Sequence, residues 1–150
     1  MLKKILIGVG LVAIAGVAYV RLSPTDLATF HVAPIATEAG DTAGINSFKA
    51  ARQITTPAAD VLRAVDQIAG SSDRTRLVAG STGEGLMTYE TRSALMGYPD
   101  YTTVTVTDGA EGPLLVINAR SRFGKGDMGV NRARVEDWLT QLGPLAVPVS

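Results

Sequence analysis

Residues Tyr101–Arg122 read YTTVTVTDGAEGPLLVINARSR and carry the clearest structural pattern in the chain. The first part alternates threonine with Val104 and Val106, which is typical of a β-strand with one apolar face. Asp108-Gly109 is a turn sequence, and the residues from Leu114 onward are first apolar and then basic. This order predicts two antiparallel strands joined by a short turn.

Further strands and two helices are predicted on either side of this hairpin. We expect strands at residues 76–79 and 86–92, and helices from Thr56-Pro57 to Gly70 and from about Val130 to Gly143-Pro144. Their apolar stripes are Val61, Leu62, Val65 and Ile68 in the first helix and Val135, Trp138, Leu139 and Leu142 in the second. Short turns and one-sided helices together predict an α+β domain, an antiparallel sheet with two helices packed on one face.

The N-terminal segment is apolar enough to enter a membrane. Lys3 and Lys4 precede the uncharged residues 5–20, and Arg21 follows them. This length spans roughly 24 Å, and flanking side chains extend it toward a hydrocarbon core of about 30 Å. We favour an uncleaved anchor through residues 5–20. A signal peptide cleaved near Gly16-Val17-Ala18 and a buried core helix are the alternatives.

The charged residues around this segment predict the orientation of the chain across the membrane. Basic residues before an apolar segment favour a cytoplasmic N-terminus. If the cell is Gram-negative, we expect a single-pass inner-membrane protein with its C-terminal domain in the periplasm. Three parts are expected: an anchor or signal at residues 1–22, a tether with a lead-in strand at 23–54, and a globular α+β domain at 55–150.

Composition excludes several kinds of chemistry. The 150 residues include no cysteine and one histidine, so disulfides, thiolate metal sites and thiol nucleophiles are excluded. The histidine and carboxylates show no ligand spacing, so neither a metal site nor a cofactor is expected. Once Lys3, Lys4 and Arg21 are set aside, 11 basic residues oppose 14 acidic ones, and no nucleic-acid partner is expected.

A polar cluster is predicted around the end of the last long strand and the start of the last helix. Arg120 and Arg122 lie two residues apart on a strand and so project from one face, where they could grip a carboxylate, a phosphate or a lipid headgroup. Internal pairing with nearby carboxylates is the alternative. The residues of this candidate anion-binding or structural cluster are Arg92, Arg120, Arg122, Asp127, Asn131 and Arg132.

Residues Gly124–Gly129 match the GxGxxG pattern between a strand and a helix. A dinucleotide site also needs a second parallel strand and an acidic residue about 20 positions further on. We therefore favour a tight strand-to-helix connection in which Asp127 or Asn131 caps the helix.

Two other features remain as candidates. The loop that joins two strands contains large apolar and aromatic residues, which predict either a docking surface or a loop folded over the sheet edge. The docking candidates are Leu95, Met96, Tyr98 and Tyr101. His31 is the only imidazole, and no nucleophile motif surrounds any serine, so a serine hydrolase is the least favoured function.

Residues 89–101 (YETRSALMGYPDY) and 119–135 (ARSRFGKGDMGVNRARV) resemble the bacterial and plastid family called domain of unknown function 1499. In the second segment the sequence departs from the family pattern at Ala119, where a serine is often found. The resemblance covers about residues 55–142 and, more weakly, 30–34. It implies a small exported domain that is often membrane-anchored, and it implies no activity.

These observations lead to two functional hypotheses. The first is a membrane-anchored periplasmic accessory protein, not an enzyme, that binds a partner protein or an inner-membrane complex. The second is the binding or processing of an anionic small molecule or lipid headgroup by the arginine cluster. No catalytic residue is assigned under either hypothesis.

Overall fold

A computed structural model describes residues 1–148. Its helices are α1 (Leu2–Leu22), α2 (Ala58–Ser71) and α3 (Val130–Leu142), with short 3₁₀ turns at Leu27–Thr29 and Gly143–Leu145. Its strands are β1 (Gly40–Ala43), β2 (Ser47–Ile54), β3 (Thr75–Ser81), β4 (Leu86–Arg92), β5 (Pro99–Gly109), β6 (Gly112–Ser121) and β7 (Ala146–Val147). The expected strands and the two amphipathic helices are all present.

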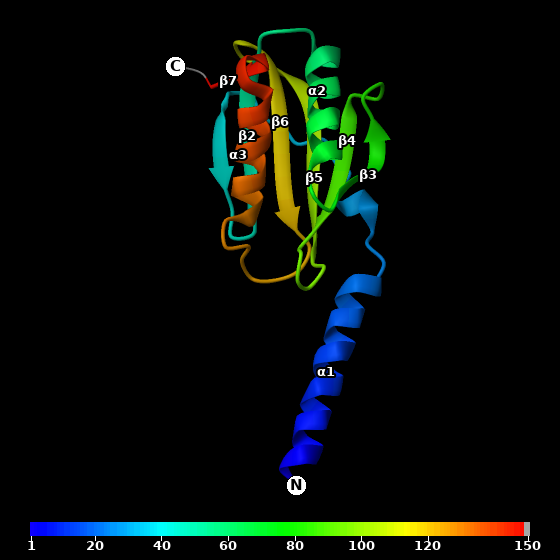
Figure 1. The fold of residues 1–150 in the computed structure, drawn as a ribbon. Helices are drawn as coiled ribbons and strands as arrows, with labels where there is room; N and C mark the ends of the chain where they lie inside the picture. Colours follow the sequence, from blue (N-terminus) through cyan, green and yellow to red (C-terminus); the bar gives the residue numbers. More distant parts are fainter. Residues whose placement is uncertain (149–150) are drawn as a thin grey trace.

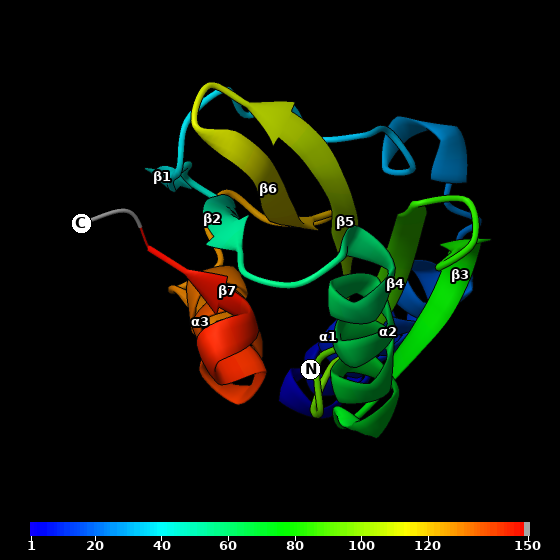
Figure 2. The same ribbon diagram turned by 90° about the horizontal axis from the view of Figure 1, so that it is seen from above.

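The strands form one antiparallel sheet in the order β1-β2-β6-β5-β4-β3, and β7 pairs with the end of β2. The hairpin of β5 and β6 lies at its centre, with Val104 opposite Ile117 and Tyr101 opposite Arg120. Helices α2 and α3 both cover one face (Figure 2). The α+β prediction with two helices on one face is therefore confirmed.

The face beneath the helices forms the main apolar core. Trp138 of α3 is 1% exposed, and its ring meets that of Tyr89 edge to face at 5.6 Å between centroids. Met87, Leu115 and Ile117 project from the same face of the sheet into this cluster. Burial of aromatic and aliphatic surface of this kind is the main source of stability of a small domain.

The other face is covered by residues 23–39, which run across it without regular strand structure (Figure 2). Phe30 lies against Tyr101 at 4.3 Å between ring centroids. Ala36 and Ala39 pack on a second apolar cluster formed by Ala51, Leu114 and Val116. Residues 23–54, expected as a tether with a lead-in strand, also contain β1 and β2, and β2 lies inside the sheet between β1 and β6.

Helix α1 extends away from the domain (Figure 1). It has 21 residues and none of them is buried, so it is not a core helix of this domain. At 1.5 Å per residue it spans about 32 Å, which matches a hydrocarbon core of about 30 Å. The chain therefore has one helix that is long and apolar enough to cross a membrane.

Candidate functional site

Arg120 in β6 and Arg122, the first residue after β6, both bind the lead-in segment on the covered face of the sheet. Arg122 donates to the carbonyls of Ser23 and Pro24 at 2.9 and 2.8 Å, and to the Thr25 hydroxyl at 2.7 Å. Arg120 donates to the Phe30 carbonyl at 2.5 Å. These two arginines therefore hold residues 23–30 against the sheet.

The surroundings of Arg120 do not suit an open anion clamp. Its guanidinium lies 5.1 Å from the centroid of the Phe30 ring, and burial lowers its pKa below the ordinary arginine value. The Phe30 carbonyl also accepts a hydrogen bond from Thr103 Oγ1 at 2.7 Å. An external anion would have to displace the lead-in segment from these donors before it could bind here.

Glu90 is the acidic centre of the same face and is 3% exposed. Its two carboxylate oxygens accept hydrogen bonds from Arg76 and Arg92, each at 2.8 Å, and from the Tyr101 hydroxyl at 3.3 Å. Burial raises the pKa of Glu90, but the hydrogen bonds from Arg76 and Arg92 lower it more, and the result is below the ordinary glutamate value. A buried carboxylate with these partners stays ionised at neutral pH.

Tyr101 belongs to this internal network. It is 2% exposed, and its hydroxyl donates to Thr25 Oγ1 at 2.6 Å. Burial raises the pKa of this phenol, so the hydroxyl keeps its proton and acts as a donor. We had grouped Tyr101 with the docking residues from its place in an aromatic loop. Tyr101 lies in strand β5, as its alternating pattern predicts, but its side chain is buried and is not available for docking.

Asp127 and Asn131 form a separate cluster at the start of α3. The Asp127 carboxylate accepts from the backbone N–H groups of Gly129 and Asn131 at 3.0 and 3.2 Å. Asn131 is fully buried, and its amide donates to Ser121 Oγ at 2.9 Å. The N-cap residue of α3 is Gly129, and Asp127 binds the first turn from two residues before it, where its negative charge occupies the position that a bound phosphate would take.

The remaining candidate of the polar cluster, Arg132, lies elsewhere. Its side chain is 59% exposed and pairs with Glu136 one turn along α3 at 2.7 Å. It also lies over the Phe48 ring at 5.3 Å from the centroid. The six residues that we grouped from sequence are therefore distributed over three places. Arg92, Arg120 and Arg122 are on the covered face, Asp127 and Asn131 are at the start of α3, and Arg132 is on its outer side.

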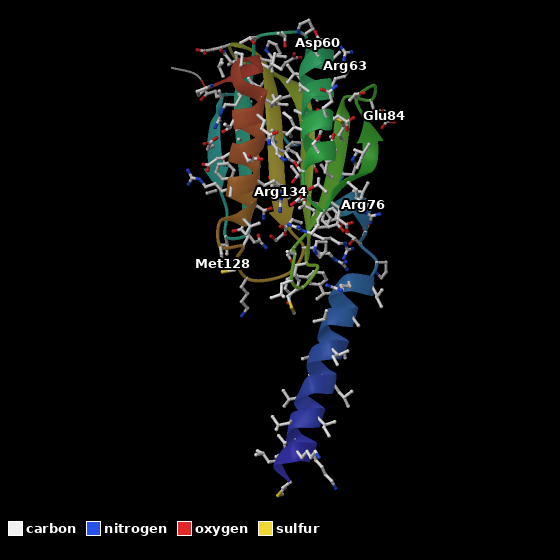
Figure 3. All side chains as sticks on the ribbon, viewed as in Figure 1. Asp60, Arg63, Arg76, Glu84, Met128 and Arg134 are labelled. Atoms are coloured by element: carbon white, nitrogen blue, oxygen red, sulfur yellow. The ribbon has the colours of Figure 1, made fainter. Side chains whose placement is uncertain are left out.

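Exposed apolar residues gather at the end of the domain from which α1 projects (Figures 1 and 3). Two loops contribute to this membrane-end patch, the one between β4 and β5 and the one between β6 and α3. Leu95 is 84% exposed, Tyr98 40% and Met128 99%. We define the membrane-end patch as the exposed residues Leu95, Tyr98, Met128 and Val130 together with the partly buried Met96 and Phe123.

The patch borders a hollow of about 440 Å³ that is mainly apolar. Val20 of α1, Tyr98, Phe123 and Met128 are among the residues that line it. The Phe123 ring lies 6.3 Å from the ring centroids of both Tyr19 and Tyr98, so the end of α1 contributes to this surface. The hollow is large enough to take one or two side chains of another molecule.

Met128 was not identified from the sequence. It lies between glycine-rich residues, and only its apolar character within an otherwise polar loop distinguished it. Its backbone φ is 50°, a conformation that costs a residue other than glycine about 1 kcal/mol. Stability does not explain a fully exposed methionine in this conformation, which makes it a candidate for a functional contact.

His31 has no arrangement suited to hydrolysis within the part of the chain that the structure describes. Its Nδ1 lies 2.9 Å from Thr88 Oγ1, and Thr88 is completely buried and also bonded to Thr103. A substrate cannot reach a hydroxyl in that position. Residues 1–148 also contain no group of three histidine, aspartate or glutamate side chains placed to hold a metal ion.

Comparisons with known proteins give a family but no activity. A family model described as a protein of unknown function, DUF1499, matches residues 24–142. None of the curated proteins matches the chain significantly. Among solved structures, the chain is similar to protein MLL2253 from Mesorhizobium loti, with 15% identity and a TM-score of 0.49 over 64% of this chain and 93% of that one. It is also similar to protein CV1439 from Chromobacterium violaceum, with 17% identity and a TM-score of 0.34 over 67% and 95% of the two chains.

Proposed function

This chain belongs to the DUF1499 family of proteins of unknown function, and we propose that it is a membrane-anchored accessory protein. In this proposal α1 crosses the inner membrane, and the domain lies in the periplasm. The domain binds a partner protein of the same membrane through the membrane-end patch. The observation that carries the proposal is the set of exposed apolar side chains around a hollow at the end of the domain where α1 begins.

Apolar side chains that stay in contact with water raise the free energy of the protein, unless a partner covers them. Leu95 and Met128 are almost fully exposed, and a monomeric soluble surface seldom gathers large apolar side chains around one hollow. Each side chain of this size gains about 1.5–3 kcal/mol when it is removed from water. A partner that covers the patch would recover that free energy.

The shape of the patch favours a protein over a bare lipid surface. A hollow of about 440 Å³ is filled by protruding side chains, as at the centre of a protein interface, whereas a flat bilayer surface would leave it empty. The end of α1 lines the hollow, so a helix of a neighbouring membrane protein can contact α1 and the patch together. This geometry supports a partner in the same membrane.

The polar groups of the domain support binding rather than catalysis. Glu90, Arg120 and Arg122 are committed to contacts with the sheet or with the lead-in segment. The alternative hypothesis, an anionic ligand held by Arg120, Arg122 and Arg132, requires these side chains to converge on one open space. They do not, because Arg132 lies on the outer side of α3 and the other two bind backbone carbonyls.

The proposal is tested by purifying the tagged full-length protein from its native membrane in mild detergent. We expect a membrane protein to co-purify in near-equal amount with the wild type, and Met128→Glu and Leu95→Glu to lose it. Ile35→Glu is the matched control, because Ile35 is also an exposed apolar residue, at 76%, but lies in the lead-in segment. A wild-type protein that is isolated alone, or a Met128→Glu variant that keeps the same partner, would overturn the proposal.

A further inference from the structure

A second pocket, apart from the membrane-end patch, lies beside the C-terminal end of α1. It has a volume of about 550 Å³. Four arginines line it together with one carboxylate, and they come from α1, from β3 and its preceding turn, and from β4. These charged residues are Arg21, Arg74, Arg76, Arg92 and Glu90. Four guanidinium groups against one carboxylate leave the pocket strongly positive.

The single carboxylate does not account for all four arginines. Glu90 is satisfied by Arg76 and Arg92. Arg74 donates Nε to the Arg92 carbonyl at 3.1 Å, and its side chain is 52% exposed. Arg21 donates to the carbonyls of Leu95 and Met96 at 3.3 and 3.2 Å. Arg74 also lies 3.8 Å from the exposed carboxylate of Asp73, its neighbour in the chain, which does not line the pocket. Arg21 contacts only backbone carbonyls, so neither arginine is paired with Glu90.

The backbone of the β4–β5 loop holds the Arg21 side chain in this position. Gly97 lies against the Arg21 side chain, and a Cβ added at Gly97 would be 2.9 Å from Arg21 Nε. Arg92 in turn donates to the carbonyls of Gly97 and Arg21 at 3.1 and 3.4 Å. The loop between β4 and β5 thus fixes the end of α1 beside the arginines of the sheet edge.

Arg21 also borders an apolar groove on the other side. This open groove of about 590 Å³ runs along α1, and Met96 of the β4–β5 loop also lines it. Its apolar lining residues are Ala13, Ile14, Val17, Ala18, Leu22 and Met96. A positive pocket and an apolar groove that share Arg21 match the two parts of an anionic phospholipid, the phosphate and the acyl chain.

We infer that this pocket binds the phosphate of an anionic phospholipid, whose acyl chain lies in the groove along α1. Arginine donates two parallel hydrogen bonds to phosphate oxygens, and such charge-assisted bonds are the strong ones. The end of a membrane-spanning helix lies at the depth of the headgroups, so Arg21 meets phosphates there. The site shares Arg92 with the candidate anion-binding cluster predicted from the sequence, but it does not include Arg120, Arg122 or Arg132.

The test uses the full-length protein in nanodiscs of phosphatidylcholine with or without phosphatidylglycerol, followed by release into detergent and native mass spectrometry. We expect wild type to retain phosphatidylglycerol in preference to phosphatidylcholine. Arg74→Gln should weaken this retention about tenfold, the effect of one lost charge-assisted hydrogen bond. Arg63→Gln is the control, because it removes the same charge from an exposed site at the far end of the domain (Figure 3). Equal retention of the two lipids by wild type, or equal behaviour of the two variants, would overturn the inference.

A second arm separates a lipid from free phosphate. Met96→Ser changes the groove and leaves the arginines in place, so we expect it to weaken lipid retention. Inorganic phosphate should compete only weakly with the lipid, because it makes no contact with the groove. If inorganic phosphate stabilises the protein against heat as much as phosphatidylglycerol does, and Met96→Ser has no effect on retention, the ligand is a free phosphate and the lipid assignment is wrong.

Discussion

Glu90 shows how one buried charge organises the polar face of the sheet. Its carboxylate accepts hydrogen bonds from Arg76, Arg92 and the Tyr101 hydroxyl. The Tyr101 hydroxyl also bonds Thr25, which links Glu90 to the lead-in segment. A carboxylate with this set of donors fixes side chains from three strands. Removing the charge leaves the arginines without their partner, which is more costly than losing a surface ion pair.

We predict that Glu90→Gln lowers the free energy of unfolding by about 2 kcal/mol at neutral pH. The pKa of Glu90 is lowered in the folded state, so the stabilisation is complete above the unfolded glutamate pKa of 4.5 and is lost as the pH falls through the folded value. Urea unfolding of wild type and variant as a function of pH measures this difference.

We expect the difference in the free energy of unfolding between wild type and Glu90→Gln to shrink as the pH falls below 4.5 and through the folded pKa of Glu90. Glu84→Gln is the control, because Glu84 is exposed in the turn between β3 and β4. A difference between wild type and Glu90→Gln that stays constant down to the lowest pH would show that the carboxylate charge is not the stabilising feature.

At the residue scale, the sequence pointed to Arg120 and Arg122 as important polar residues, but it did not show which groups accept their hydrogen bonds. Arg120 lies in β6, whereas Arg122 follows the end of that strand, and both side chains bind the lead-in segment. Their partners are backbone carbonyls of residues 23–30, and a carbonyl has no signature in a sequence because every residue carries one. The buried position of Tyr101 could not be predicted from its aromatic neighbours, because it depends on Thr25 and Glu90, which are distant in the sequence.

At the scale of elements, the lead-in segment is the least regular part of the domain and depends on side chains to stay in place. Its contacts include the arginine bonds at residues 23–30 and the small apolar cluster at Ala36 and Ala39. The helices and central strands have strong periodic patterns, which is why they were predicted correctly. The lead-in segment has no such pattern, because backbone groups make many of its contacts.

We predict that Arg122→Ala loosens the lead-in segment while the sheet stays folded. Arg122 provides three hydrogen bonds to residues 23–25, so we expect the backbone amide of His31 to exchange with solvent at least tenfold faster. Hydrogen exchange read by mass spectrometry measures this rate separately from that of β5 and β6.

The matched control for this prediction is Arg132→Ala, which removes an exposed arginine that contacts Glu136 and the Phe48 ring but no residue of the lead-in segment. Its lead-in amides should exchange at the wild-type rate. If Arg122→Ala leaves the exchange of residues 23–37 unchanged, the arginine does not hold the segment, and it becomes available for another role.

At the scale of the whole molecule, α1 and the membrane-end patch lie at the same end of the domain (Figure 1). Lys3 and Lys4 stand at the far end of α1, so the charge bias predicts that they stay in the cytoplasm and that the domain is outside it. The family membership adds no information on activity, and the proposed function rests on this geometry.

The predicted orientation can be measured by cysteine labelling, because the natural chain has no cysteine. We expect Glu84→Cys to react with a membrane-impermeant maleimide in intact cells whose outer membrane has been made permeable. Lys3→Cys should react only after the cells are broken. The reverse pattern would place the domain in the cytoplasm and contradict the proposed location.

The most direct test of partner binding is photocrosslinking in the native membrane. A photoreactive phenylalanine derivative at Met128 should give a discrete heavier product that contains a membrane protein. The same group at Arg63, at the opposite end of the domain, should give none (Figure 3). The same products from both positions would contradict the proposal and make the patch an ordinary surface. Products with lipid alone at Met128 would also contradict it and make the patch a membrane contact.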